Sequence, residues 1–308
     1  MNYKYAVIGA GAIGGFYGIR LAQSGAEVSF LLKSDYEHVL NNGLRLESVE
    51  GDIQLNDVEA FSDPEAMERC DVAIVGLKSV NNQVLLDILN NVLNDQGIVI
   101  LLQNGYREEE DIYGIERVRK LYSGLCFICS TKTGPGLIKH TDYGLVNLAE
   151  YGPNYKPLPP DSTAQRIRDD FNEAGLKVSL KDNLHSARWE KLVWNIPFNG
   201  LSVVLNANTR ELIDDPYSLD MIYALMHETL RGAELNGAPV DKGFPEKMIQ
   251  NTRSMKPYYP SMKADYDRGK RMETESIFGN PLRSAKDKGE NLPCIEMLYR
   301  ELSFLNPA

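Results

Sequence analysis

The sequence predicts an α/β protein with two parts: a first domain in which strands and helices alternate, and a second domain that is entirely helical. Three observations carry this prediction. Short apolar runs typical of buried strands alternate with helical patterns up to about residue 182. The first of these runs ends at a cluster of glycines that opens a helix. From residue 183 to residue 304 almost no strand pattern occurs, so we expect domains at residues 1–182 and 183–308.

The N-terminal glycine cluster predicts a site for a phosphate-containing ligand. The apolar run Tyr5–Ile8 is typical of a buried strand, and a helical pattern over Ile13–Gln23 follows. Gly9, Gly11 and Gly14 have the G-x-G-x-x-G spacing. In this context, after a strand and at the start of a helix, the spacing indicates a Rossmann-type dinucleotide-binding domain.

Each glycine of this motif has its own task. Gly9 allows the tight turn out of the strand, Gly11 lets the backbone approach a pyrophosphate, and Gly14 lets the helix pack closely on the strand. The N–H groups of the helix N-terminus attract the phosphates. The alternative is a glycine-rich turn without a ligand. We expect the cofactor to be held by Gly9, Gly11, Ala12, Ile13 and Gly14.

The end of the second predicted strand bears on the choice of cofactor. This strand covers Glu27–Leu32, and in an NAD-specific fold an acidic residue near its end would bind the ribose 2′-hydroxyl. Here Lys33 and Ser34 follow the strand, which favours the 2′-phosphate of NADP. Asp35 comes directly after them and leaves NAD open.

The rest of the first domain continues the alternation and then extends the sheet. A hairpin is predicted at 44–58, a strand at 71–77, a helix at 80–93, a strand at 97–102, an antiparallel extension at 122–150, a helix at 161–174 capped by Asp161 or Ser162, and a strand at 176–180.

Two polar residues follow strands of this predicted sheet. Lys78 comes after the strand 71–77, and Asn104 comes after the strand 97–102. Ligands of a doubly wound sheet bind beyond the carboxyl ends of its strands, so both residues are candidates for the site. The alternatives are a solvated loop lysine and a turn-forming asparagine before Gly105.

The composition of the chain argues against two classes of binding partner. The chain has 308 residues, 43% hydrophobic and 25% charged, with a net charge of −10 and no block of Lys or Arg. Nucleic acid and anionic membrane are therefore not expected partners. Several glycines and Arg20 interrupt the N-terminal apolar run, and no stretch approaches the roughly 20 apolar residues of a membrane span. We expect a soluble, uncleaved, cytoplasmic protein.

Cysteine and histidine do not predict a metal or disulfide site. Cys126 and Cys129 form a C-x-x-C, but they lie in a predicted strand, where positions three apart face opposite sides. We expect them to pack as small buried hydrophobes, with a redox or metal role as the alternative. The four histidines show no spacing typical of metal ligands.

A polar stripe opens the helical domain. Lys191, Asn195 and Asn199 are spaced by four and four within an apolar segment, so they share one face of a helix. Buried polar groups need partners, and a row of three suggests that the partner is a ligand. An internal hydrogen-bond network is the alternative.

With these motifs in place, the chain resembles the ketopantoate reductase (2-dehydropantoate 2-reductase) family from about Lys4 to Phe304. The features that carry the resemblance are the glycine loop, Lys78, the Asn-Gly at 104–105, and the K-x-x-x-N-x-x-x-N from Lys191 to Asn199. The resemblance implies reduction of 2-dehydropantoate to pantoate by NADPH, a step of pantothenate biosynthesis. The partner would be a small-molecule 2-keto acid, and a homodimer is one oligomeric state it allows.

The resemblance also implies roles for these residues. Lys191 would be the general acid, and burial on an apolar face in a cationic neighbourhood would lower its pKa from about 10.4 toward neutrality. Asn195 and Asn199 would bind substrate, and Lys33 the cofactor. Lys78 would line the nicotinamide side of the cofactor site, and Asn104 would contact both cofactor and substrate.

Two more residues match the family pattern of a Ser followed twelve positions later by a Glu. Similarity assigns Ser261 to the substrate carboxylate and Glu273 to a catalytic hydrogen bond that orients Lys191 or the substrate hydroxyl. The alternatives are a helix-capping serine after Pro260 and a solvated helix glutamate.

The sequence departs from the family pattern at three places. Pro197 should kink or restart the helix, Gly200 replaces a usual proline, and Phe278-Gly279-Asn280 replaces a usual Asn-Gly. These departures leave open a different branched 2-keto acid. A non-catalytic NADP-sensing regulator is a further alternative, as is an opine or glycerol-phosphate dehydrogenase of the same architecture.

Overall fold

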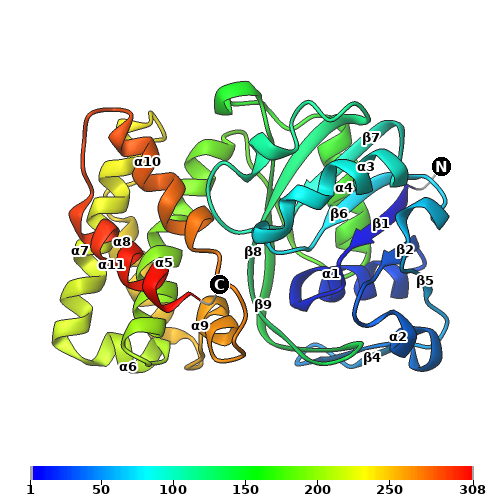
Figure 1. The fold of residues 1–308 in the computed structure, drawn as a ribbon, viewed down its shortest axis with the longest axis horizontal. Coiled ribbons are helices and arrows are strands. Elements are labelled where there is room, and N and C mark those ends of the chain that lie inside the picture. Colours follow the sequence, from blue (N-terminus) through cyan, green and yellow to red (C-terminus); the bar gives the residue numbers. More distant parts are fainter. Residues whose placement is uncertain (1–2, 307–308) are drawn as a thin grey trace. The chain divides into compact units, whose positions relative to one another are not determined.

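The computed structural model describes residues 3–306, which divide into two compact units (Figure 1). Unit 1 runs to Gln103 and continues from Glu109 to Leu184. Unit 2 comprises Asn104–Glu108 and the chain from His185 onward. A five-residue segment that follows a strand of the sheet therefore belongs to the helical unit, and no sequence pattern indicated this.

Unit 1 is built on one sheet. Within residues 3–306 this sheet has ten strands in the order β4-β3-β9-β8-β7-β6-β1-β2-β5, with β10 paired to β9. The strands are β1 (Lys4–Ile8), β2 (Glu27–Leu31), β3 (Leu44–Ser48), β4 (Ile53–Leu55), β5 (Glu59–Phe61), β6 (Cys70–Val75), β7 (Leu93–Leu101), β8 (Val118–Gly134), β9 (Leu137–Glu150) and β10 (Val178–Leu180).

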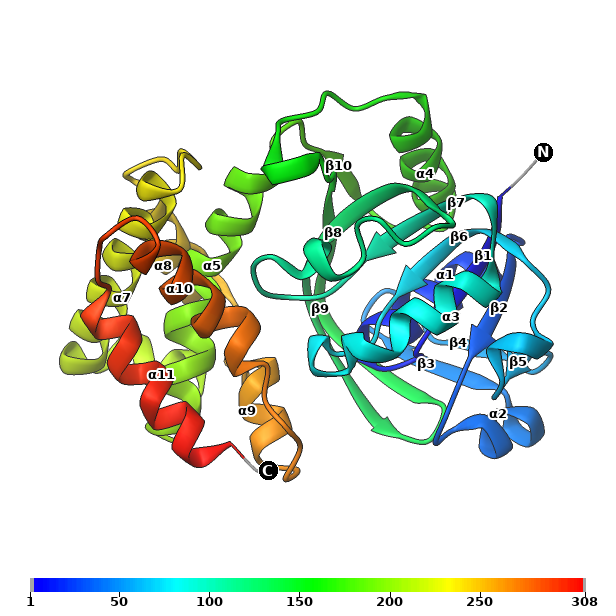
Figure 2. The ribbon, with the colours of Figure 1, turned by 45° about the horizontal axis from the view of Figure 1, so that its top comes forward.

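The pairing separates a parallel core from an extension. From β5 through β2, β1, β6 and β7 to β8 every neighbouring pair is parallel, as a Rossmann-type domain requires. β8 and β9 then form a long antiparallel hairpin (Figure 2). β3 and β10 pair with β9 in parallel, and β3 forms an antiparallel hairpin with β4. The predicted fold class, the hairpin at 44–58 and the antiparallel extension are confirmed.

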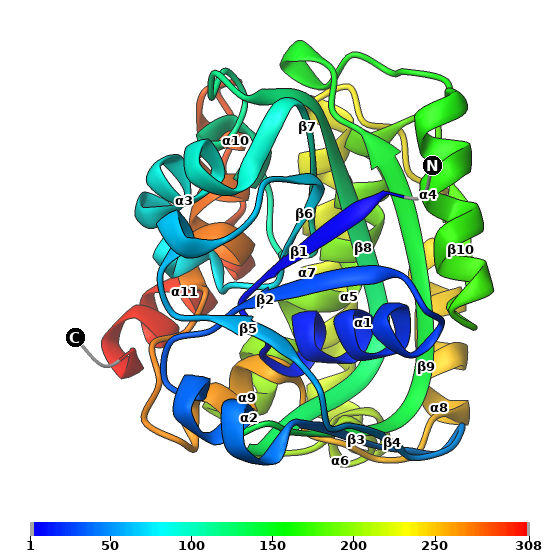
Figure 3. The ribbon, with the colours of Figure 1, turned by 90° about the vertical axis from the view of Figure 1, so that its right-hand side faces the viewer.

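Helices cover both faces of this sheet. They are α1 (Ala12–Gln23), α2 (Tyr36–Asn42), α3 (Leu85–Val92) and α4 (Ser162–Glu173), with 3₁₀ turns η1 (Pro64–Ala66), η2 (Ser79–Val84), η3 (Glu108–Asp111) and η4 (Pro153–Tyr155). α3 lies on one side, and α1 and α4 lie on the other (Figure 3). On that second side Phe16 and Tyr17 of α1 pack with Phe171 of α4 in the main apolar core. Asp161 caps α4 by accepting a hydrogen bond from the N–H of Ala164, as predicted.

Unit 2 is helical. It contains α5 (Leu184–Val204), α6 (Thr209–Asp214), α7 (Pro216–Leu235), α8 (Phe244–Ser254), α9 (Ser261–Tyr266), the π-helical turn η5 (Glu275–Gly279), α10 (Asn280–Lys286) and α11 (Pro293–Leu305). α5 is buried along most of its length, because Trp189, Val193, Ile196 and Phe198 are all fully enclosed. Within residues 3–306, no helix combines the length and apolar character needed to cross a membrane.

Candidate functional site

Three backbone segments meet at the glycine motif of unit 1. Gly9 has a φ of +87°, which favours glycine in the turn out of β1. A Cβ on Gly14 would collide with the carbonyl oxygen of Gly9 and lie 3.3 Å from Cα of Gly76. A Cβ on Gly76, which follows β6, would in turn lie 2.7 Å from Cα of Gly14. The first turn of α1 therefore packs directly on two strand ends. Sequence reasoning missed Gly76, although a glycine ending a buried strand is a signal for close approach.

Gly11 differs from its neighbours because nothing crowds it. A Cβ at Gly11 would find its nearest protein atom, the carbonyl oxygen of Gly76, at 4.0 Å. Gly11 is the N-cap of α1, with no side-chain cap and no acidic residue in the first turn. The first N–H groups of the helix, from Ala12 to Gly14, have no intrahelical acceptor. Open space beside uncapped N–H groups fits the pyrophosphate of a dinucleotide.

The two candidate lysines of unit 1 follow strands of the parallel core. Lys33 is exposed just beyond β2, and within residues 3–306 its side chain forms no ion pair or hydrogen bond. Lys78 is half-buried, follows β6 and precedes η2. β2 and β6 both flank β1, so the two lysines follow the strands on either side of the strand that carries the glycine turn.

The polar stripe of unit 2 lies on one buried helix. Lys191, Asn195 and Asn199 of α5 are 7%, 5% and 2% exposed. The amide nitrogen of Asn195 is buried and has no hydrogen-bond partner among the described residues. Leaving such a donor unpaired costs about 1–3 kcal/mol. A ligand acceptor at this position would remove that cost, which fits the predicted role in binding substrate.

The structure brings Asn199 and Ser261 together. Oδ1 of Asn199 accepts a hydrogen bond from the N–H of Met262 at 3.1 Å and from Oγ of Ser261 at 3.4 Å. Ser261 is the exposed first residue of α9, and its N-cap is Pro260. The simple alternative of a capping serine is therefore not observed, because Asn199 satisfies the helix N–H from 63 residues away.

The two chain neighbours of Glu273 are held by one residue, Asn306. The side chain of Glu273 itself is 4% exposed. Asn306, the C-cap of α11, accepts a hydrogen bond from the N–H of Met272 at 2.7 Å. The Asn306 amide also donates to the carbonyl of Met272 at 3.3 Å and to Oγ1 of Thr274 at 3.1 Å. Asn306 was missed by sequence reasoning, since an asparagine after a helix indicates only where the helix ends.

Asn104 is carried by the segment 104–108 of unit 2. Gly105 has a φ of +109°, and a Cβ on it would collide with Ser276. The N–H of Tyr106 donates to the carbonyl of Ser276 at 2.9 Å, and the amide of Asn280 donates to the carbonyl of Tyr106 at 2.7 Å. Asn104 thus belongs to the same compact unit as Lys191. Its side chain is half-buried.

Comparison with known proteins identifies the family. The family model described as ketopantoate reductase PanE/ApbA matches residues 5–153, and its C-terminal counterpart matches residues 183–306. The chain belongs to the ketopantoate reductase family. It is 46% identical to the 2-dehydropantoate 2-reductase of Nostoc sp. over 98% of this chain and 95% of that relative.

Solved structures of other proteins share this fold. The crystal structure of 2-dehydropantoate 2-reductase from Geobacter metallireducens matches with a TM-score of 0.91 and 34% identity, covering 97% of this chain and 99% of that one. The ternary structure of D-mandelate dehydrogenase with NADH and anilino(oxo)acetate matches with a TM-score of 0.87, covering 98% of this chain and 97% of that one. At 24% identity this second likeness is one of fold alone.

The residues Pro197, Gly200 and Phe278, which depart from the ketopantoate reductase pattern, are buried within unit 2. Pro197 was expected to kink or restart the helix; α5 continues through Pro197, so the restart is wrong, and the kink stays a prediction. The neighbours Ile196 and Phe198 are fully buried, and their packing sustains the helix. A Cβ at Gly200 would lie 2.5 Å from Cδ2 of Leu298 and 3.1 Å from Cζ of Phe278. Gly200 and Phe278 therefore fit each other inside the core.

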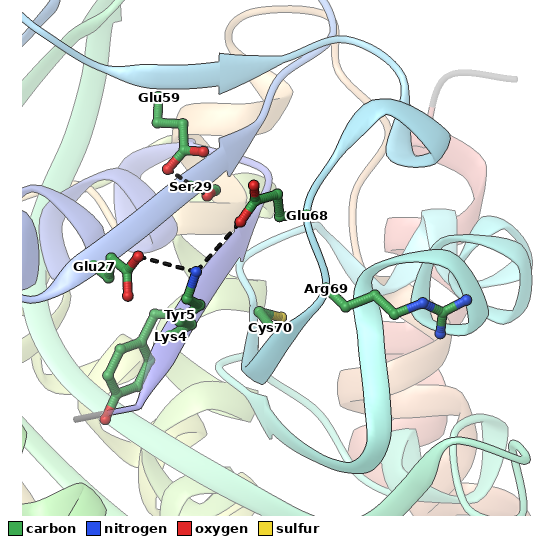
Figure 4. Close-up of a pocket in the computed structure, with 8 residues that line it drawn as sticks. All are labelled: Lys4, Tyr5, Glu27, Ser29, Glu59, Glu68, Arg69 and Cys70. Atoms are coloured by element: carbon green, nitrogen blue, oxygen red, sulfur yellow. Dashed lines mark hydrogen bonds and ion pairs between the residues drawn. The ribbon is translucent and has the colours of Figure 1, made fainter. Parts of the chain in front are cut away.

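The structure also shows other groups that could have formed a site. Figure 4 shows a small cavity at the opposite ends of the strands, where Lys4 forms ion pairs with Glu27 at 3.0 Å and Glu68 at 3.3 Å. Cys126 and Cys129 are buried and form no disulfide with a described residue, and their burial fits the expectation that they pack as small hydrophobes. Burial raises the pKa of Cys129 to about 12, so its thiol is unreactive near neutral pH. Within residues 3–306, no cluster of His, Cys, Asp or Glu could hold a metal ion.

Proposed function

We propose that this chain reduces 2-dehydropantoate to pantoate with NADPH, a step of pantothenate biosynthesis. The observation that carries the proposal is the buried stripe of Lys191, Asn195 and Asn199 on one continuous helix, where the amide nitrogen of Asn195 has no partner within residues 3–306. Two of the relatives above, at 46% and 34% identity, bear the name 2-dehydropantoate 2-reductase.

Lys191 and Glu273 are the proposed catalytic residues. The chemistry that a bound nicotinamide supplies is hydride donation to the carbonyl carbon of the substrate. Nζ of Lys191 donates a proton to the substrate oxygen, which avoids an unstable alkoxide. Glu273 orients either that ammonium group or the new hydroxyl. Both side chains are buried, so water competes weakly for their hydrogen bonds.

The remaining residues of unit 2 hold the substrate. The amide nitrogen of Asn195, which no described residue pairs with, donates to an oxygen of the keto acid. Ser261, exposed and bonded only weakly to Asn199 at 3.4 Å, can turn its hydroxyl to the carboxylate. Asn104 adds a further amide from the segment 104–108.

Backbone and lysine groups of unit 1 hold the cofactor. The N–H groups from Ala12 to Gly14 bind the pyrophosphate, and Lys33 binds the 2′-phosphate of NADP. Lys78 lines the nicotinamide side. D-mandelate dehydrogenase shares the fold and was solved with NADH, so the fold by itself does not choose between the two dinucleotides. The choice rests on the residues after β2.

The test is NADPH oxidation by the purified chain, followed by absorbance. Turnover with 2-dehydropantoate and NADPH, exceeding that with NADH, supports both reaction and cofactor. Faster turnover with another branched 2-keto acid would keep the reaction class and change the substrate. Tight NADPH binding without turnover on any keto acid would favour a sensor instead. A homodimer and a cytoplasmic location remain predictions from the sequence, and size-exclusion chromatography with light scattering checks the first.

A further inference from the structure

Asp35 is the first carboxylate after β2, the position at which an NAD-specific fold binds the ribose 2′-hydroxyl. In this structure the carboxylate is fully engaged by the protein. Nζ of Lys132, on β8, lies 2.6 Å from Oδ1 and 2.5 Å from Oδ2. The N–H of Gly136, in the turn between β8 and β9, donates to Oδ2 at 2.9 Å. Oγ of Ser34 donates to Oδ1 at 2.9 Å.

The side chain of Asp35 is much less exposed to solvent than that of its neighbour Lys33. The side chain of Asp35 is 8% exposed and that of Lys132 is 27% exposed, whereas Lys33 is open to solvent. Burial acts to raise the Asp35 pKa, but the hydrogen bonds from Lys132, Gly136 and Ser34 outweigh it and hold that pKa below its ordinary value of 3.8. Asp35 is therefore ionised, and Lys132 compensates its charge.

We propose that the Asp35–Lys132 ion pair makes the end of β2 acceptable to a 2′-phosphate. Lys132 turns the carboxylate inward and neutralises it, so that Lys33 is the charge which the loop presents to the cofactor. This inference rests on the proposed use of NADPH and assigns Lys132 a role in selecting the dinucleotide. Lys132 acts through Asp35 and is a positioning residue.

Removal of the lysine charge tests the proposal. Lys132→Met keeps the apolar stem of the side chain and leaves the Asp35 carboxylate uncompensated beside the cofactor site. Two like charges repel strongly at a partly buried site, so NADPH affinity should fall by about 10-fold or more. NADH lacks the 2′-phosphate, so its affinity should stay within about 2-fold of the wild-type value. A change of about 2-fold is about the spread found for independent effects on binding energy.

The matched variant is the double substitution Asp35→Asn with Lys132→Met. It removes both charges together, so it should restore NADPH affinity to near the wild-type value. Affinities for NADPH, NADH, 2′,5′-ADP and 5′-AMP are measured by equilibrium fluorescence or calorimetric titration. The two nucleotide fragments isolate the 2′-phosphate from the nicotinamide, and none of these readouts requires turnover.

The outcomes separate this inference from the proposed function. A loss confined to the 2′-phosphorylated ligands, rescued by the double variant, supports it. Equal loss for NADPH and NADH would mean that Lys132 only supports the fold, and the inference fails. Failure of the double variant to rescue would mean that Lys132 itself contacts the phosphate, which also overturns it. Wild-type reduction of 2-dehydropantoate is assayed separately, so that the reaction can stand even if the inference falls.

Discussion

The two units hold their candidate site residues by opposite means. At the glycine motif of unit 1 the site is made of backbone, and it exists because side chains are missing at Gly9, Gly14 and Gly76. In unit 2 the site is made of buried side chains on α5, whose partners come from distant parts of the chain. Adding atoms should therefore damage the first site, and removing atoms should damage the second.

The largest expected effect is on turnover, at Lys191. Lys191→Ala removes the proton donor and should lower kcat by at least ~100-fold, the usual scale of general acid catalysis. NADPH affinity should be retained, because the glycine motif, Lys33 and Lys78, which are proposed to hold the cofactor, lie in unit 1. Lys191→Arg keeps the positive charge but cannot give up a proton, so it should be similarly inactive. Wild-type turnover in either variant would show that Lys191 is not the acid.

The glycine motif offers a pair of variants that separate fold from ligand. Gly14→Ala would force a Cβ against the Gly9 carbonyl and should destabilise unit 1 by about 1–3 kcal/mol, measured by urea unfolding. A Cβ in Gly11→Ala would have the Gly76 carbonyl oxygen, at 4.0 Å, as its nearest neighbour, so the melting temperature should be unchanged. Its added methyl should instead obstruct the pyrophosphate and weaken NADPH binding at least ~10-fold, a loss of about 1.4 kcal/mol. If Gly11→Ala lowered stability and left NADPH affinity unchanged, the dinucleotide would not bind at this turn.

The two asparagines of the stripe should also behave differently. Asn199→Leu leaves the N–H of Met262 without its acceptor and should cost about 1–3 kcal/mol of stability. Asn195→Leu removes an amide nitrogen that has no partner among the described residues, so stability should be kept or rise. Its KM for the keto acid should rise about 10-fold through one lost hydrogen bond to a charged ligand. If Asn195→Leu left KM unchanged, Asn195 would not bind substrate.

A smaller effect is expected at Asn306, which acts through Glu273. Asn306→Ala removes the bonds to Met272 and Thr274, and the looser placement of Glu273 should reduce kcat by about 3- to 10-fold. In a Glu273→Gln background the same change should have little further effect on kcat. Additive losses in the double variant would indicate that Asn306 serves stability alone.

The smallest effect is in acid stability at Asp35. Because the folded-state pKa lies below 3.8, Asp35 contributes its full stabilisation above that pH. The contribution is lost as pH falls through the folded pKa. The difference in unfolding free energy between wild type and Asp35→Asn should thus be constant near neutral pH and shrink below about pH 3.8. A difference that grew on acidification would contradict the ion pair.

The sequence predicted more of the glycine turn in unit 1 than of the buried side-chain contacts in unit 2. The alternation of strands and helices, the glycine turn and the change to helices near Asp182 are local patterns, and the strands and helices they predict are present. The three-residue strand β5 escaped because Glu59–Phe61 is too short to show a period. Gly76 carries a local signal that was not used.

The contacts of unit 2 could not be read in this way. Spacing on α5 predicts that three polar residues share a face, but no local pattern says that Asn199 meets Met262 or that Asn306 clamps the backbone around Glu273. The same holds for Gly200 and Phe278, two departures from the family pattern that pack against each other. Such pairs depend on tertiary packing between segments 34 to 78 residues apart.

The segment Asn104–Glu108 has a consequence for how such a gene could be recombined. The helical unit is not encoded by one continuous stretch, because Tyr106 bonds through its backbone to Ser276 and Asn280 while the chain before and after the segment belongs to unit 1. A chimera joined only near residue 184 would combine the segment of one parent with the helices of another. Exchanges between relatives should therefore succeed most often when the codons for these five residues travel with the helices.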